Sequence, residues 1–400
     1  LAFRLVVSGV AAALLIALGG PIAAALLHGE AYRKYVGVGA ATLPFTLLVL
    51  FCNDVLRVTF QPVKYITLNL VQTVLVTTLS IVFVGPFHLS TAGVLYGRLA
   101  GDALSSLVGL VLIRHALGHR FDRGTLRRML AYGAPTIPAA FAFALITGLD
   151  RFWLQRTRTI EEVATYSVAL RFLSVMTFAA SAFQLAYGPF VYARARDPGA
   201  PRLFARVLVG YIAVASLGAM IVGLFAPEVL RVLVTRAYHP DAASLPALLL
   251  AFAAVALGAY TVGSIGIGLA LKTPLLAVGA WSGAVVAAAA HATLTPRLGP
   301  SGAAIATLAG YVSVAGVTFV LAQRVHPLPY RGARAAGLFA LALVLALLAQ
   351  RLAPPGAWGV AVRAAAVLMF AGVCARAKVW TERAAVAAPR PAPAAGDAVG

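Results

Sequence analysis

The sequence of 400 residues has few cysteines and few acidic side chains: it contains two Cys and 12 Asp or Glu residues. Cys52 and Cys374 lie far apart without paired spacing, so neither a disulfide framework nor a metal site is indicated, and we expect no cofactor. Long polar stretches are also missing, because the connections 114–129 and 227–243 are only 16 and 17 residues long. No connection is therefore large enough to form a catalytic domain.

The sequence has instead a succession of twelve apolar segments of membrane-spanning length. A hydrocarbon core about 30 Å thick needs about 20 apolar residues per helix, and lipid-exposed backbone must satisfy its own hydrogen bonds. A hydrophobic fraction of 61% and a mean hydropathy of +0.91 agree with this interpretation. The sequence predicts an all-α polytopic membrane protein with spans near 5–27, 36–56, 65–84, 92–113, 130–150, 163–187, 207–226, 244–270, 274–295, 301–321, 335–352 and 358–375.

The net charge of +20 comes from Lys and Arg residues, most of them in the short connections. If residue 1 is cytoplasmic and the sides alternate, 20 of the 32 basic residues are cytoplasmic, nine lie opposite and three lie within spans. Cytoplasmic loops of membrane proteins are enriched in Lys and Arg. We therefore expect both ends of this sequence to lie in the cytoplasm. Because membrane topology accounts for the basic residues, we expect no nucleic-acid partner.

Three pairs of short matches indicate an internal repeat. The segment 93–101 (GVLYGRLAG) is echoed by 302–310 (GAAIATLAG) at an offset of 209, Lys64 by Lys272 at 208, and residues 31–32 by 237–238 at 206. Matches in one order at nearly one offset predict a duplicated six-helix lobe in parallel orientation. The counterparts of the spans at 130–187 would precede Leu1, so we expect an N-terminally truncated sequence that lacks two helices.

The predicted domains follow from this repeat. We expect residues 1–121 to be a four-helix remnant of the N-terminal lobe and 122–327 to be a complete C-terminal six-helix lobe. Residues 328–377 would add a further pair of transmembrane helices. The Pro- and Ala-rich segment 378–400 predicts a disordered cytoplasmic tail.

Ionisable residues inside spans are costly and are therefore the best pointers to function in such a chain. Arg98 and Asp102 lie four residues apart on one helix face and can neutralise each other. This pair is either a helix-packing ion pair or part of a cavity, and Asp102 is also a candidate for ion coupling. His291 is a second candidate, because histidine can relay a proton at neutral pH, although a hydrogen-bonded interhelical histidine is the alternative.

Arg171 lies in a span without an acidic residue within one helical turn. Ser167, Ser174 and Gln184 fall with it, together with Thr177 and Ser181, in an arc of roughly 140° at 100° per residue. Such a stripe is expected to face water or a polar ligand. In the alternative, the hydroxyls bond to their own backbone carbonyls and Arg171 pairs with Asp54 or Asp102.

The third span carries an uncharged polar face that includes Asn69 and Gln72. Amide groups of this kind suit sugar hydroxyls, and they suit hydrogen bonds between helices equally well. The pairs Asp150–Arg151 and Asp54–Arg57 fall at span ends, where we expect them to anchor the helices at the membrane interface. Arg363, the sixth residue of the last apolar block, is expected to snorkel or to bind lipid phosphate.

Four segments then carry a family resemblance. The segments 132–138 (YGAPTIP), 149–154 (LDRFWL), 162–169 (EVATYSVA) and 183–190 (FQLAYGPF) resemble the start of the second lobe in bacterial lipid-linked oligosaccharide flippases. These flippases are the polysaccharide exporters of the multidrug/oligosaccharidyl-lipid/polysaccharide superfamily. The resemblance follows the order of spans over most of the chain and is specific over about 60 residues, 132–192.

The resemblance implies two pseudo-symmetric lobes around a central cavity in the bacterial inner membrane. It implies a transporter and not an enzyme, which moves an undecaprenyl-pyrophosphate-linked sugar repeat unit to the outer leaflet by alternating access, for O-antigen, capsule or exopolysaccharide synthesis. Implied partners are the lipid-linked oligosaccharide, membrane lipids, polysaccharide assembly proteins, and H⁺ or Na⁺ as the coupling ion. Arg171 occupies the place where a basic residue commonly follows the family's tyrosine, and Arg98 is a second candidate for the pyrophosphate.

Two other functions are weighed against the flippase. A multidrug or cation antiporter of the same superfamily would favour carboxylates within the membrane, whereas only Asp102 lies deep in a predicted span, with Arg98 beside it. A membrane polymerase or ligase usually has a large outer loop with catalytic Arg or His. The outer connection 227–243 is short and holds only Arg231, Arg236 and His239.

Overall fold

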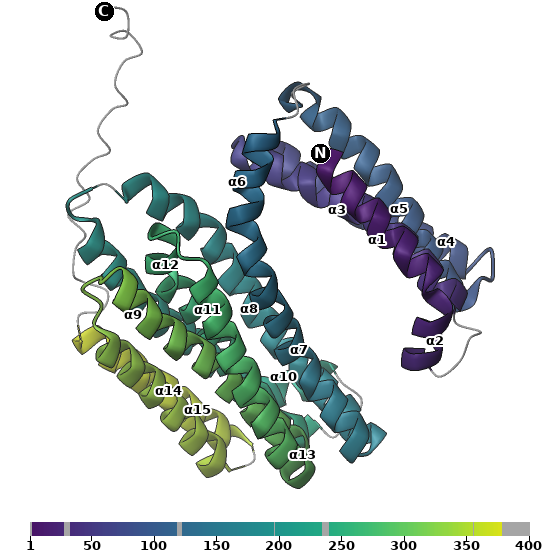
Figure 1. Cartoon of the computed structure of the whole chain (residues 1–400). Helices are drawn as coiled ribbons and strands as arrows, with labels where there is room; N and C mark the ends of the chain where they lie inside the picture. The colour runs from purple at the N-terminus through teal and green to yellow at the C-terminus, as the bar shows by residue number, and fades with distance from the viewer. Residues whose placement is uncertain are drawn as a thin grey trace, which may run out of the picture. The chain divides into compact units, whose positions relative to one another are not determined.

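The computed structural model describes residues 2–27, 33–117, 122–195, 197–233, 240–354 and 356–377. These residues form α-helices and short 3₁₀ turns, and no strand occurs among them (Figure 1). They divide into two compact units, Leu1–Asp122 and Arg123–Gly400. The tail predicted at 378–400 lies outside the described residues.

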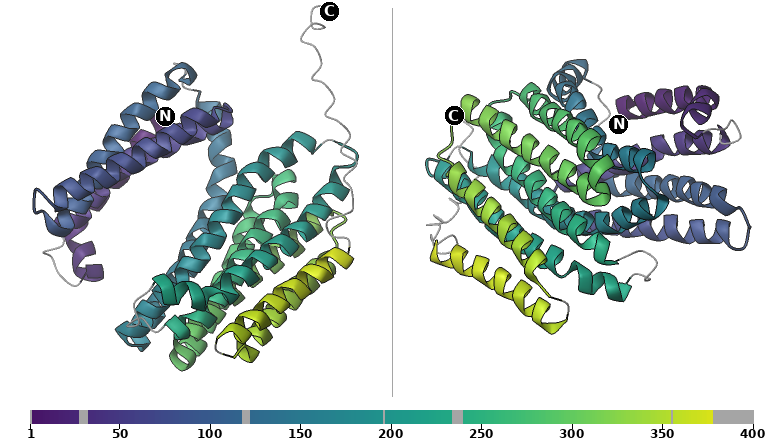
Figure 2. Two further views of the ribbon diagram at one scale, coloured as in Figure 1. Left: turned by 180° about the vertical axis from the view of Figure 1, so that it is seen from behind. Right: turned by 90° about the horizontal axis from the view of Figure 1, so that it is seen from below.

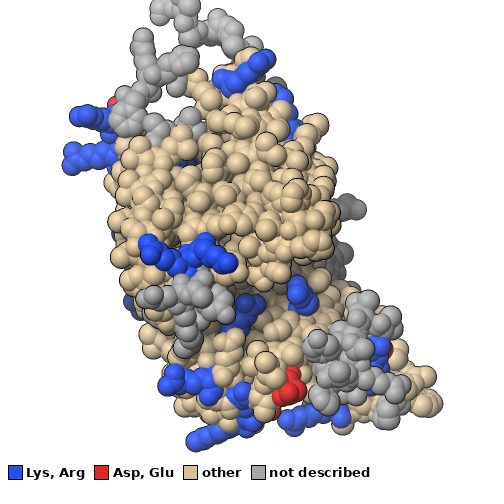
Figure 3. Space-filling view, turned by 90° about the vertical axis from the view of Figure 1, so that its right-hand side faces the viewer, with Lys and Arg blue, Asp and Glu red and all other residues tan. Residues whose placement is uncertain are grey.

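Ten helices in the described part of the chain are long and apolar enough to cross a membrane. One of them, α13 (Pro274–Val325), covers two of the predicted spans, and α1 (Ala2–Ala17) and α2 (Gly19–Leu27) together cover another. The prediction of an all-α polytopic membrane protein is therefore confirmed. On the face shown in Figure 3, Lys and Arg side chains lie in separate groups beside broad uncharged surface, and few Asp or Glu appear.

The N-terminal unit contains α1, α2, α3 (Arg33–Val58), α4 (Pro62–Val84) and α5 (Ser90–Ile113). Helix α3 contacts both α1 and α5, and α5 also packs along α4. The first predicted span is interrupted at Leu18, because Pro21 has no N–H to donate to the carbonyl of Ala17. The helix resumes when Ile22 N–H donates to Leu18 O at 3.0 Å.

The C-terminal unit is built around α11 (Pro240–Gly263), whose residues 247–256 are each at most 4% exposed. A helix that is apolar on all sides is stable only when other elements cover it. Contacts with α11 come chiefly from α8, α9 and α13, and α14 and α15 continue outward from α9 (Figure 2). The other helices are α6 (Arg123–Gly133), α7 (Ile137–Thr157), α8 (Ile160–Arg194), α9 (Ala200–Leu224), α10 (Ala226–Leu233), α12 (Ile265–Leu269), α14 (Gly332–Leu352) and α15 (Ala357–Arg376).

Helices α4 and α5 form an antiparallel hairpin whose backbones approach closely at three glycines of α5. Gly93, Gly97 and Gly101 occur at every fourth position and therefore share one face. A Cβ at Gly101 would lie 2.6 Å from Val76 Cγ2, and one at Gly97 would overlap the backbone of Ser80. Small residues at such positions let membrane helices pack by van der Waals contact, which is their main attraction in lipid.

The two halves of α13 form a second hairpin of the same kind. They meet at Gly299, which has a left-handed φ of 57°, and Gly310 of the second half packs on Ala287 of the first. Left-handed residues also bound α4, where Phe60 precedes it and His88 follows it, just as Leu271 precedes α13. Phe60 and Leu271 are 211 residues apart, as are His88 and Gly299, so the turns of the two hairpins correspond.

We predict that Gly97→Ala destabilises the α4–α5 hairpin. The added methyl group has no room against Ser80, and overpacking of this kind costs about 1–3 kcal/mol. The matched control is Gly37→Ala on α3, where no atom lies within 4 Å of an added Cβ, so the variant should be neutral or slightly stabilising. Thermal unfolding of the detergent-solubilised chain measures both, and equal melting temperatures would contradict the prediction.

Candidate functional site

The N-terminal unit holds a buried carboxylate, Asp102, at the contact of three helices. Asp102 is 1% exposed. Its Oδ2 accepts a hydrogen bond from Thr46 Oγ1 of α3 at 2.6 Å, and its Oδ1 accepts one from Gln72 Nε2 of α4 at 2.8 Å. Arg98 Nε lies 3.8 Å from Oδ2, with the Arg98 side chain 62% exposed. The carboxylate therefore joins α3, α4 and α5, while most of the guanidinium stays accessible.

A second polar contact in this unit joins Asn53 of α3 to Asn69 of α4. Asn69 Nδ2 donates to Asn53 Oδ1 at 3.1 Å and to its own helix at Tyr65 O at 2.8 Å. The structure thus places Asn69 and Gln72 in hydrogen bonds between helices, which was one of the two uses that their side chains suggested. Their role as sugar ligands stays a prediction.

Arg171 lies exposed on α8, on a side that the other helices of its unit leave uncovered. Within the described residues it makes no hydrogen bond and no ion pair. Ser167 donates to Val163 O at 2.8 Å and Ser174 donates to Leu170 O at 3.1 Å, so these hydroxyls do bond back to their own helix. Each hydroxyl oxygen and every guanidinium N–H is still available to a ligand.

The partners that could have neutralised Arg171 are engaged elsewhere. Asp54 accepts hydrogen bonds from Arg57 at 2.5 Å and from Arg4 at 3.1 Å, which agrees with the predicted anchor at the end of α3. Asp102 already contacts Thr46, Gln72 and Arg98. Gln184, the last member of the predicted stripe, is half-buried on α8.

The interpretation of Asp150 as an interfacial anchor is wrong. Asp150 is 3% exposed; its Oδ2 accepts from the hydroxyl of Tyr166 at 3.0 Å and its Oδ1 from the backbone N–H of Arg151 at 2.6 Å. The Tyr166 hydroxyl also lies 3.4 Å from Thr307 Oγ1. Asp150 therefore joins α7 to α8, and the Tyr166 hydroxyl continues the contact to α13.

His291 of α13 is fully buried, with Nδ1 3.1 Å from Thr295 Oγ1 one turn along the same helix. Its Nε2 has no hydrogen-bond partner among the described residues. The expected hydrogen bond to a neighbouring helix is therefore not seen. A buried ring nitrogen without a partner keeps His291 as a candidate for proton relay.

Arg363 neither snorkels nor faces lipid phosphate, in contrast to the expectation from sequence. Its side chain is 11% exposed and forms an ion pair with Glu228 of α10. Helix α15 packs on α9, and α10 directly follows α9, so the fold brings this acid to Arg363. The partner lies 135 residues away in the sequence, where no local pattern could indicate it.

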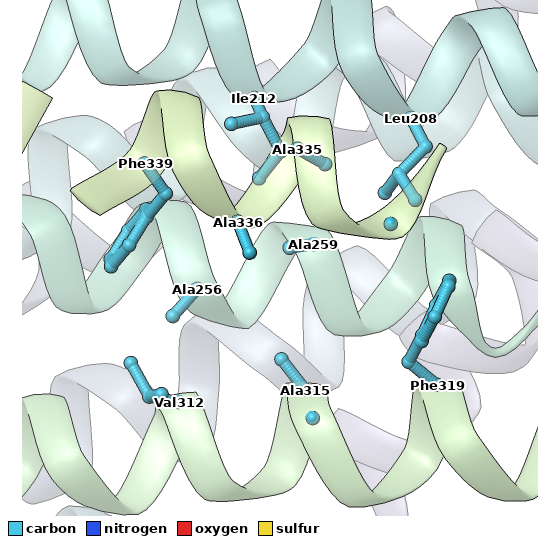
Figure 4. Close-up of a pocket in the computed structure, with 12 residues that line it drawn as sticks. Leu208, Ile212, Ala256, Ala259, Val312, Ala315, Phe319, Ala335, Ala336 and Phe339 are labelled. Atoms are coloured by element: carbon cyan, nitrogen blue, oxygen red, sulfur yellow. The ribbon is translucent and has the colours of Figure 1, made fainter. Parts of the chain in front are cut away.

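The C-terminal unit also contains an apolar pocket of about 220 Å³ between α9, α11, α13 and α14 (Figure 4). Hydrocarbon side chains and glycines line it, so it offers no side-chain donor to a charged head group. Such a surface suits hydrocarbon only. Its lining residues are Leu208, Ile212, Ala256, Ala259, Val312, Ala315, Gly316, Phe319, Gly332, Ala335, Ala336 and Phe339.

Comparison with known families gives a match over residues 2–243 to the model described as "Polysaccharide biosynthesis protein". This match covers more than half of the chain. The chain belongs to the polysaccharide biosynthesis protein family. The matched region of this family member includes Asp102, Asp150 and Arg171 and ends before α13 begins. No curated protein matches the sequence.

Solved structures show the fold of this family member. A mutant of the Vibrio cholerae MATE transporter VcmN aligns with a TM-score of 0.64 and 17% identity, covering 81% of this chain and 77% of that one. Lipid II flippase MurJ in an inward closed conformation aligns with a TM-score of 0.61 and 13% identity, covering 87% and 75%. The bent form of VcmN gives 0.62 and 15%. The fold is thus that of MATE and MurJ transporters.

We predict that Arg363→Met destabilises the contact of α15 with α10. The change leaves Glu228 without its cation, which should cost about 1–3 kcal/mol, less than for a fully buried pair because Glu228 is still 34% exposed. The double variant Arg363→Met with Glu228→Leu should recover part of the loss. The control is Arg351→Met at the exposed end of α14. Equal thermal unfolding of the Arg351 and Arg363 variants would refute the coupling.

Proposed function

We propose that the protein is a flippase that moves an undecaprenyl-pyrophosphate-linked oligosaccharide from the cytoplasmic to the outer leaflet by alternating access. Membership of the polysaccharide biosynthesis family and the transporter fold support a carrier in this process. The observation that carries the substrate assignment is Arg171, an unpaired cation on a polar stripe of a membrane helix. The net charge of +20 also favours an anionic substrate.

The chemistry of Arg171 fits a pyrophosphate head group. A guanidinium binds phosphate oxygens through two parallel N–H donors, and this interaction strengthens where water is excluded. Ser167, Ser174 and Gln184 would bind sugar hydroxyls along the same stripe. No covalent step is required, since the head group needs only a polar path while the prenyl tail stays in lipid.

The N-terminal unit carries a second candidate surface of its own. Arg98 keeps most of its guanidinium accessible, because its contact with Asp102 is long and its side chain is 62% exposed. Asn69 and Gln72 lie on the neighbouring α4. We assign Arg98 as a candidate phosphate ligand within the N-terminal unit and Asp102 as the group that positions it.

The organisation of the protein follows the same proposal. Residues 1–121 and 122–327 would be lobes of one duplicated ancestor, which the corresponding left-handed turns at Phe60 and Leu271 support. Residues 328–377 would be an added pair of helices. The protein would lie in the bacterial inner membrane with both visible ends in the cytoplasm, and would serve O-antigen, capsule or exopolysaccharide synthesis together with assembly proteins.

The alternatives have weaker support. A multidrug or cation antiporter would need a carboxylate within reach of a bulky cation, whereas Asp102 and Asp150 are 1% and 3% exposed. A polymerase or ligase would need catalytic groups in the outer connection 227–243. Helix α10 occupies the first seven residues of that connection and α11 its last four, and Arg236 and His239 lie outside the described residues.

We predict that Arg171→Ala lowers polysaccharide export about tenfold, the effect of one lost charge-assisted contact to phosphate. Arg171→Lys should retain part of the activity, because it keeps the charge without the two parallel donors. Arg202→Ala, at the exposed start of α9, is the control and should export normally. The assay is restoration of surface polysaccharide by the natural gene in a strain that lacks its flippase.

Two failures of this assay have different meanings. If the unaltered gene inserts normally into the membrane but restores no polysaccharide, the flippase function is wrong. If the gene restores export and Arg171→Ala exports as well as Arg202→Ala, only the assignment of Arg171 is wrong.

We further infer that Asp102 is the ion-coupling residue, because a carboxylate that joins three helices can transmit protonation or Na⁺ binding to their packing. Asp102→Asn, which nearly preserves shape, should reduce export and make it insensitive to an ionophore that collapses the driving gradient. Asp54→Asn in the exposed pair with Arg57 should keep the sensitivity of the wild type. If Asp102→Asn responds to the ionophore like the wild type, coupling falls to His291, and His291→Gln tests it.

A further inference from the structure

The N-terminal unit contains a second pocket, of about 400 Å³, at the end of α3 and α5 opposite to the Asp54–Arg57 pair. The first turns of α3 and α5 line it together with the loop that joins α4 to α5. Unlike the apolar pocket between α9 and α14, it has both polar and hydrocarbon walls. The lining residues are Lys34, Tyr35, Val38, His88, Leu89, Ser90, Ala92, Leu95 and Tyr96.

Among the described residues, two basic side chains line this pocket. Lys34 is exposed, and its ammonium lies 5.1 Å from the centroid of the Tyr35 ring. His88 is also exposed, and its side chain makes no hydrogen bond or ion pair within the described residues. None of the nine lining residues is acidic. The pocket therefore favours an anion over a cation.

The loop holds His88 in an uncommon backbone conformation. His88 and Ser90 have φ values of 52° and 48°, in the left-handed region that few residues other than glycine adopt. Backbone hydrogen bonds fix the turn, with His88 N–H donating to Gly85 O and Leu89 N–H donating to Phe83 O, each at 3.1 Å. The turn therefore fixes the backbone position of His88 at the edge of the pocket.

The uncharged walls indicate that the anion belongs to a lipid. Val38, Ala92 and Leu95 lie on α3 and α5, both of which are membrane-spanning in length and composition. Tyr35 lies in the first turn of α3 and Tyr96 in the second turn of α5, and aromatic rings near the ends of spans are typical of membrane interfaces. Phe87 and Leu89, 62% and 40% exposed, lie in the loop beside the pocket. A soluble anion such as inorganic phosphate would make no favourable contact with these hydrocarbon surfaces.

We propose that this pocket binds the phosphate-bearing head group of a membrane lipid, with Lys34 and His88 contacting the phosphate and the tyrosines flanking the first part of the lipid. The two lipids of this chemistry are a polyprenyl phosphate carrier and an anionic phospholipid. The site is distinct from the stripe around Arg171, and its occupation does not depend on transport. The proposal can therefore stand or fall separately from the flippase function.

The test is lipid binding to the intact detergent-solubilised chain, measured by native mass spectrometry. Because Arg171 and Arg98 would bind the same phosphate, every variant is prepared both with these two arginines and with Arg171→Ala and Arg98→Ala together. The probes are undecaprenyl phosphate, phosphatidylglycerol, phosphatidylcholine and inorganic phosphate. We expect Lys34→Met to weaken binding of the first two about tenfold, as expected for the loss of one charge-assisted contact.

Two further variants sharpen the test. His88→Asn removes the imidazole but keeps a residue that tolerates left-handed backbone, so it should weaken binding without disturbing the turn. Lys64→Met is the matched control, because Lys64 is an exposed lysine in the first turn of α4 that does not line the pocket. It should bind each lipid as the unaltered chain does. Thermal unfolding of each variant reports whether the fold is kept.

The comparison of probes decides the assignment. Stronger binding of undecaprenyl phosphate than of phosphatidylglycerol identifies the carrier as the ligand, the reverse identifies bulk anionic lipid, and either supports the site. Equal affinities of the Lys34 and Lys64 variants would overturn the proposal. So would phosphatidylcholine binding as tightly as phosphatidylglycerol, or inorganic phosphate binding as tightly as the lipids.

Discussion

A charged group inside a bilayer is stable only beside a partner, and the described helices obey this constraint nearly everywhere. Asp102 and Asp150 each accept hydrogen bonds from neighbouring groups, and Arg363 is neutralised by Glu228. These contacts act between helices, so they fix the packing of segments whose apolar surfaces fit lipid equally well. Arg171 departs from the rule, and its departure makes it the strongest sign of a ligand in the chain.

Shape complementarity supplies the remainder of the helix association. In lipid there is no hydrophobic driving force between apolar helices, so close backbone contact at small residues has to replace it. The α4–α5 hairpin and the α13 hairpin both use glycine in this way, at Gly97 and Gly310 among others. The same device occurs in both units and in hairpins bounded by corresponding turns, which is what a duplicated ancestor would leave behind.

The helical architecture was predictable because membrane insertion depends on hydropathy summed over about 20 residues, a property of continuous sequence. The Asp54–Arg57 ion pair could also be predicted from the sequence, since its members lie within one helical turn. Asp150 and Arg363 were misinterpreted because each meets partners that other helices bring to it, Tyr166 and Glu228. The pocket around Lys34 gave no signal, because its two bases are 54 positions apart and only the packing of α3 on α5 joins them.

The ion pair between Arg363 and Glu228 bears on how the last two helices take part in motion. Helices α14 and α15 follow α13 and contact the rest of their unit chiefly through α9, where α14 makes the larger contact. Because α15 is also fastened electrostatically to α10, the terminal hairpin has two points of attachment on one body. In the alternating access proposed above, this hairpin would therefore move together with the C-terminal unit and would not act as an independent gate.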